Sequence, residues 1–229
     1  MGSNALKPIN KEPVSQTIVT YTQSLIHSAA NSIKYAESYP QDAQITIILS
    51  TLAVEAFLNE LGNVNSFVPK EELSTSLNLS ASVLDELEKN NAQIRLKLMV
   101  SYYALTGKLI DKGAQPYQDF DLLVDIRNAL VHPKPIRLSQ RAVEDNGQHK
   151  FVKQLISRKV IDPPNEGLTK SWRTYILQPS VARWSYSVAT SIIVDLIDQI
   201  PSKLEKGLFG IIEMSIIGAS AWQNKYDEK

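Results

Sequence analysis

The chain has 229 residues, of which 43% are hydrophobic and 21% are charged, proportions that are typical of a globular protein. It contains no cysteine, which excludes disulfides, thiolate nucleophiles and cysteine-ligated zinc. The formal net charge is zero, which argues against a protein that coats nucleic acid non-specifically.

Spacing of the apolar residues predicts a mainly α fold, a bundle of five or six helices. Seven segments are candidates for these five or six helices, and two of them, 80–89 and 204–222, are expected to be short: residues 14–39, 41–61, 80–89, 92–111, 117–132, 179–200 and 204–222. We expect Pro40, Gly62 and Gly113 to end three of these segments, and Ser80 to cap the start of another. No linker-like tract divides the chain, so we predict one domain over residues 14–229. Residues 1–13 are expected to be a disordered N-terminus that begins with a cloning remnant.

The helical spacing of apolar residues is lost over residues 135–177, which we predict to be an insertion in the bundle. Asn146-Gly147 separates two partly alternating runs, and this pattern predicts a small β-hairpin. The charge is also uneven. Ten basic and four acidic residues over 127–173 give a net charge of +6, and nine acidic and two basic residues over 37–91 give −7. The basic segment fits a phosphate-bearing ligand and equally fits a solvated, lysine-rich hairpin.

The most informative stretch lies at the end of one predicted helix: Asp125-Ile126-Arg127-Asn128-Ala129-Leu130-Val131-His132-Pro133. A helical wheel places Arg127 between apolar neighbours, so its guanidinium needs a carboxylate or a phosphate as partner. Asn128 and His132 fall on the polar face. Arginine, asparagine and histidine suit phosphodiester chemistry, because they stabilise anionic oxygens and transfer a proton near neutral pH. The alternative is structural, with Arg127 in a salt bridge and His132 as a helix-ending cap.

This motif resembles the signature of the HEPN superfamily, an arginine followed by a polar residue and, a few positions later, a histidine late in a bundle helix. The helix around Glu55 is also similar to an early, alanine-rich helix of bacterial members. The resemblance implies a helical bundle that dimerises and brings two Arg/His motifs together in a cleft. It also implies catalytic roles for Arg127 and His132, a supporting role for Asn128 and a helper role for Glu55.

Many HEPN-like proteins are metal-independent endoribonucleases of toxin–antitoxin or defence systems, and others are non-catalytic nucleotide-binding or protein-interaction modules. Our hypothesis is an endoribonuclease acting through the ribose 2′-hydroxyl, as a homodimer and with an antitoxin or other protein partner. The non-catalytic module is the alternative. An apolar helix over residues 208–222 is a further candidate docking surface.

We predict no metal and no cofactor, because the three histidines are scattered and phosphate-binding glycine loops are absent from the sequence. His149 is expected to face solvent. Asp119, Asp121 and Asp125 are expected to supply favourable charge early in the motif helix. We expect a cytoplasmic protein without a membrane span, because the sequence shows neither a secretory leader nor an apolar run of about 20 residues.

Overall fold

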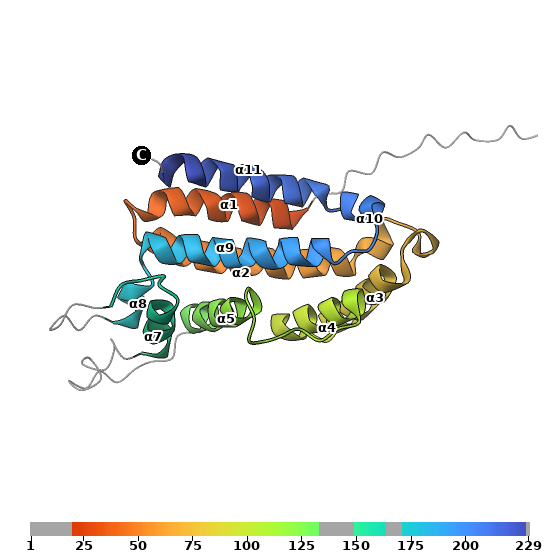
Figure 1. Cartoon of the computed structure of the whole chain (residues 1–229), viewed down its shortest axis with the longest axis horizontal. Coiled ribbons are helices and arrows are strands. Elements are labelled where there is room, and N and C mark those ends of the chain that lie inside the picture. Colours follow the sequence, from red (N-terminus) through yellow and green to blue (C-terminus); the bar gives the residue numbers. More distant parts are fainter. Residues whose placement is uncertain (1–19, 133–148, 164–170, 228–229) are drawn as a thin grey trace, which may run out of the picture.

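The structure is a computed structural model that describes residues 20–132, 149–163 and 171–227 (Figure 1). Over these residues it is mainly helical and contains no strand, so the predicted α class is confirmed. The helices are α1 (Tyr21–Ala36), α2 (Gln41–Gly62), α3 (Thr75–Lys89), α4 (Ile94–Thr106), α5 (Tyr117–Val131), α7 (Lys150–Ser157), α8 (Trp172–Tyr175), α9 (Pro179–Asp198), α10 (Lys203–Gly207) and α11 (Gly210–Asp227). Two 3₁₀ turns, η1 (Val64–Ser66) and η2 (Lys70–Glu72), connect α2 to α3.

Helix α2 is the centre of the bundle. It contacts α1, α9, α3 and α5, and the layers of Figure 1 show it behind α9, between α1 on one side and α5 on the other. Its side chains Ile47, Val54, Phe57 and Leu58 have no exposed surface. Among the described helices, α2 is the one long and apolar enough to cross a membrane, but 56% of that stretch is buried inside the fold. A core helix of a bundle accounts for this composition.

Several helix ends differ from those predicted. Helix α3 begins earlier than expected because Ser74, not Ser80, is the cap: its hydroxyl accepts a hydrogen bond from the backbone N–H three residues on, at 3.3 Å. Ser80 is instead buried and lies 3.1 Å from the hydroxyl of Ser101. Helix α4 ends at Gly107, whose φ of 70° is the left-handed conformation that glycine favours, and not at Gly113.

The predicted insertion is helical where the structure describes it. We expected residues 148–155 to form the second strand of the hairpin. That prediction is wrong, because residues 150–157 form the helix α7. Phe151, Val152 and Leu155 share one buried face at helical spacing, which explains the helix. The Asn146-Gly147 turn lies outside the described residues, as do residues 1–13. The last predicted helix is observed as two helices, because the helical conformation is interrupted at Leu208 and Phe209, between α10 and α11.

Gly62 is the last residue of α2, as expected, and it also has a packing role. A Cβ added there would lie 3.1 Å from the Cβ of Leu84 and 3.3 Å from the backbone nitrogen of Asp85, both on α3. Both contacts are tighter than ordinary van der Waals packing. The close approach of α2 and α3 therefore depends on the absence of a side chain at this position.

We predict that Gly62→Val lowers the free energy of unfolding by about 1–3 kcal/mol, because the added methyl groups force α3 away from α2. The matched control is Gly207→Val, at an exposed glycine with open space around its Cα, which we expect to change stability by less than about 0.5 kcal/mol. Urea unfolding of both variants checks this. Equal effects would show that the α2–α3 approach is not constrained at Gly62.

Candidate functional site

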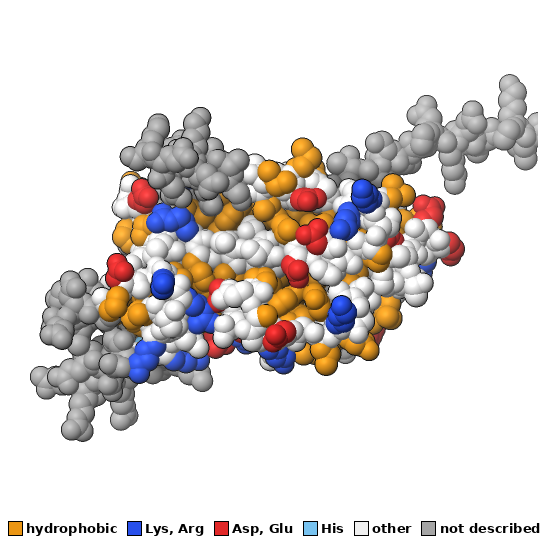
Figure 2. Space-filling view, viewed as in Figure 1, with side chains coloured by type: hydrophobic (Ala, Val, Ile, Leu, Met, Phe, Trp, Pro, Cys, Tyr) orange, Lys and Arg blue, Asp and Glu red, His pale blue; other side chains and the backbone are white. Residues whose placement is uncertain are grey.

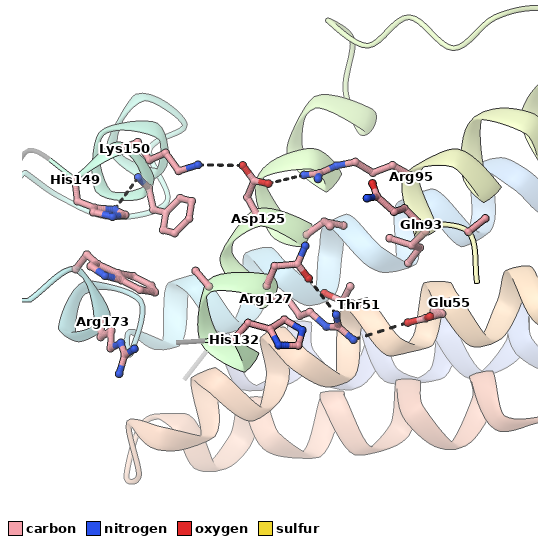
Figure 3. Close-up of a pocket in the computed structure, with 17 residues that line it drawn as sticks. Thr51, Glu55, Gln93, Arg95, Asp125, Arg127, His132, His149, Lys150 and Arg173 are labelled. Carbon is pink, nitrogen blue, oxygen red and sulfur yellow. Dashed lines mark hydrogen bonds and ion pairs between the residues drawn. The ribbon is translucent and has the colours of Figure 1, made fainter. Parts of the chain in front are cut away.

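A cleft of about 760 Å³ opens along α5 (Figure 3). Helix α2 contributes Thr51 and Glu55 to one wall, and the start of α4 contributes Arg95. Helix α5 forms the floor with the polar side of its second half. Helices α7 and α8, from the predicted insertion, close the other end with aromatic and basic side chains. The cleft is therefore built from segments that are far apart in the sequence.

All four residues predicted to be catalytic line this cleft: Glu55, Arg127, Asn128 and His132. The Arg127 guanidinium is the centre of the group. Its Nη1 donates a hydrogen bond to Asn128 Oδ1 at 3.1 Å, and its Nη2 lies 3.9 Å from Glu55 Oε2. Figure 3 shows the His132 ring beside the same guanidinium. The fold thus brings together two elements, α2 and the end of α5, that only the motif resemblance had connected.

Arg127 is incompletely paired. A guanidinium carries five N–H donors, and among the described residues only the bond to Asn128 is within hydrogen-bond distance. Its Nε is buried without a hydrogen-bond partner, and the Glu55 contact is at the outer limit for an ion pair. The side chain keeps 24% of its surface exposed to the cleft. Unused donors on a permanently charged group favour an anionic ligand.

His132 is placed by the end of α5. Its backbone N–H still bonds the carbonyl of Asn128 at 2.9 Å, but its φ and ψ of −118° and 63° leave the helical region. The next residue is proline, which disfavours a helical conformation for His132. Its side chain is exposed. The chain therefore presents the imidazole at the mouth of the cleft, free to meet a ligand.

The acidic residues of α5 form ion pairs, and Asp119 also lies in the first turn of the helix, as expected. Arg95 of α4 donates to Asp121 Oδ1 at 2.9 Å and to Asp125 Oδ1 at 2.8 Å. Lys150 of α7 lies 3.4 Å from Asp125 Oδ2. Burial alone would raise the pKa of Asp125, but the bonds and charges of Arg95 and Lys150 outweigh it and hold that pKa below its ordinary value. Asp125 thus ties α4 and α7 to α5.

The α7–α8 end of the cleft is aromatic. His149 caps α7, with Nδ1 accepting the Phe151 backbone N–H at 3.3 Å. Its ring stacks on Trp172, with centroids 5.1 Å apart and an interplanar angle of 15°, and meets the Phe151 ring edge-on at 4.8 Å. The Arg173 guanidinium lies 5.7 Å from the Trp172 centroid. The expectation that His149 simply faces solvent is therefore wrong.

Positive charge gathers in the cleft although the chain is neutral overall. Its lining has four cationic side chains, Arg95, Arg127, Lys150 and Arg173, against the carboxylates of Glu55 and Asp125. Figure 2 shows Lys and Arg side chains gathered over α7 and α8. The sequence signal for this end was the net charge of +6 over residues 127–173, which alone did not identify the side chains. In the described part of the chain, no group of three or more His, Asp or Glu side chains is arranged to hold a metal ion.

No protein-family model, curated protein or solved structure matches the chain. The function of the chain must therefore be inferred from the cleft residues, their geometry and the motif resemblance.

The ion pair between Arg158 of α7 and Asp119 of α5 should hold the insertion on the bundle. Their side chains are 15% and 10% exposed, so Arg158→Ala leaves a buried carboxylate unpaired. We predict a loss of about 2–3 kcal/mol. Lys150 is 65% exposed, and Lys150→Ala should cost less than about 1 kcal/mol. Urea denaturation measures both, and adding Asp119→Asn to Arg158→Ala should restore part of the loss. Similar small effects for the two alanine variants would contradict this account.

His149 should make stability depend on pH. Burial, with a smaller effect of Lys150, holds its pKa below the ordinary value, so the folded state binds fewer protons than the unfolded state. The stability that His149 contributes is therefore present above about pH 6.5 and is lost as the pH falls below it. We predict that the stability of the parent falls more steeply from pH 8 to pH 5 than that of His149→Asn, which keeps a capping oxygen but does not titrate. Urea unfolding at several pH values tests this, and parallel curves would contradict it.

Proposed function

We propose that this chain is a HEPN-like, metal-independent endoribonuclease of toxin or defence type, and that its helical bundle is of the HEPN kind. One observation carries the proposal: the incompletely paired guanidinium of Arg127 lies in a basic cleft together with Asn128, His132 and Glu55. This is the set that the motif resemblance implies for RNA cleavage, and it comes from two separate helices.

The proposed reaction is an attack of the ribose 2′-oxygen on the adjacent phosphorus. The O2′–P bond forms, the P–O5′ bond breaks, and the products are a 2′,3′-cyclic phosphate and a free 5′-hydroxyl. O2′ loses a proton and O5′ gains one. His132 transfers one of these protons and water carries the other, so the reaction balances without an added oxidant, reductant or metal.

Each residue has a role that follows from its position. The free N–H donors of Arg127 stabilise the charge that develops on the non-bridging phosphate oxygens. Asn128, bonded to Arg127, orients the guanidinium. Glu55 approaches the same group from α2 and limits its motion. The exposed imidazole of His132 is placed to reach the attacking or the leaving oxygen.

The proposal includes the homodimer, the antitoxin or other protein partner and the cytoplasmic location that the resemblance and the sequence favour. Exposed apolar side chains on α11 support a protein-contact surface there. Ile211, Met214 and Ile217 recur at helical spacing and are 53%, 74% and 61% exposed, and Figure 2 shows apolar side chains over this helix. Such a row on a surface helix is typical of a docking face.

The second candidate is a non-catalytic nucleotide-binding module. The aromatic and basic α7–α8 end of the cleft favours it, since stacking and phosphate pairing explain those side chains without any chemistry. Such a module would bind RNA or a nucleotide near Arg127 and release it unchanged. Cleavage assays separate the two functions.

We predict that the protein cleaves single-stranded RNA in the presence of EDTA, leaves 2′,3′-cyclic phosphate ends, and does not cut where the ribose 2′-hydroxyl is replaced by hydrogen. His132→Ala should slow cleavage about 100-fold or more, because proton transfer is lost. Arg127→Ala should slow it about 100- to 1,000-fold, because the developing phosphate charge is no longer stabilised. Rates come from end-labelled RNA resolved on gels.

The matched control is His27→Ala, which removes an exposed histidine on α1 outside the cleft and should cleave as the parent does. Equal cleavage by the parent, Arg127→Ala and His132→Ala would overturn the mechanism. Binding of RNA without cleavage by any of them would favour the second candidate.

A further inference from the structure

We propose that the α7–α8 end of the cleft is a separate subsite that binds an unpaired nucleotide next to the scissile phosphate, so that the substrate is single-stranded RNA of at least two nucleotides. This inference rests on the proposed function. It assigns the recognition of the substrate to His149 and Arg173, which the cleavage chemistry does not use, and the neutralisation of Asp125 in part to Lys150.

The first support is a preformed aromatic surface. His149 is partly exposed where it borders the cleft, and one of its faces lies on Trp172, which is 5% exposed. Phe151 meets both rings edge-on, with centroids at 4.8 and 5.2 Å. The bond from the Phe151 N–H to Nδ1 fixes the ring further. A rigid, uncharged imidazole offers a base a stacking surface without an ordering cost, and burial keeps the pKa of His149 below its ordinary value.

The second support is the position of the exposed cation Arg173 beside this surface, with Lys150 near it on α7. Lys150 projects from the first turn of α7 with 65% of its side chain exposed, and Arg173 is exposed on α8. Figure 3 shows both at the α7–α8 end of the cleft, with His132 and then Arg127 farther along it. Base stacking with flanking phosphate contacts is the usual mode of single-strand binding. Paired bases have their faces covered by neighbours, so the subsite selects unpaired RNA.

The third support is the neutralised centre of the cleft. Asp125 lies between the two ends and would repel a phosphate backbone if it were unpaired. It is instead paired to Arg95 at 2.8 Å and to Lys150 at 3.4 Å. The path from the His149 surface to Arg127 therefore carries no uncompensated negative charge. A strand can run along α5 with one base on His149 and the following phosphate at Arg127.

The test measures binding of 2′-O-methyl RNA, which lacks the attacking hydroxyl and stays intact. Fluorescence anisotropy compares a labelled mononucleotide with a labelled tetranucleotide on the parent, His149→Asn, Arg173→Ala and the control Arg183→Ala. His149→Asn keeps the cap of α7 and removes the ring. Arg183 is on α9, pairs with Glu37 and does not line the cleft.

We expect the parent and Arg183→Ala to bind the tetranucleotide at least about tenfold more tightly than the mononucleotide, the scale of one stacked base. His149→Asn should lose most of this gain. Arg173→Ala should weaken the tetranucleotide and lower the slope of log Kd against log salt by about 0.7, the value for one phosphate contact. In cleavage assays both variants should raise KM and leave kcat unchanged.

Equal affinity for both lengths, or a length effect that both variants retain, would overturn the subsite. The failure of the proposed function has a different signature. Absence of cleavage together with the expected binding pattern would remove the nuclease and keep the subsite as part of a binding module.

Discussion

Burial of one face of α5 against α2 and α9 positions Arg127, Asn128 and His132 at the cleft. Leu123 and Ile126 are fully buried in that contact. Because a helix turns 100° per residue, fixing these two directs Asn128 away from the core and places Arg127 at the edge of the buried face, where its side chain lines the cleft. The same packing fixes where the C-terminal end of α5 lies, and therefore the position of His132. Glu55 depends on the equivalent burial of α2, whose core side chains leave its polar side facing Arg127.

The insertion completes a cleft that the bundle alone would leave open at one end. Its attachment combines a nearly buried ion pair, Arg158 with Asp119, and an exposed one, Lys150 with Asp125. The buried pair contributes more to holding α7 in place, because breaking it leaves an unpaired charge in a low-dielectric environment. The exposed pair contributes little to stability and instead neutralises the floor of the cleft. The basic side chains of the insertion thus have a structural role, and we propose a binding role for Arg173.

Sequence periodicity predicted the long helices well, since α2, α5 and α9 each bury a continuous apolar face. Helix ends were predicted less well, because several serines and glycines compete to cap α3 and α4 and only tertiary packing selects Ser74 and Gly107. The Asn-Gly hairpin prediction failed for residues 150–157, where burial of an apolar helical face determines the structure. The motif residues were found by resemblance, whereas the aromatic end joins side chains over 20 positions apart, such as His149 and Trp172, which no local pattern reveals.

We propose that one strand of RNA occupies the whole cleft, with its phosphate at Arg127. A crystal structure of the protein with a bound 2′-O-methyl RNA tetranucleotide tests this most directly. The account predicts a phosphate within hydrogen-bond distance of Arg127, His132 within reach of O2′ or O5′, and the neighbouring base stacked on His149. RNA bound on another face of the molecule, or a cleft whose Arg127 pairs only with Glu55 and Asn128 when RNA is bound, would contradict it.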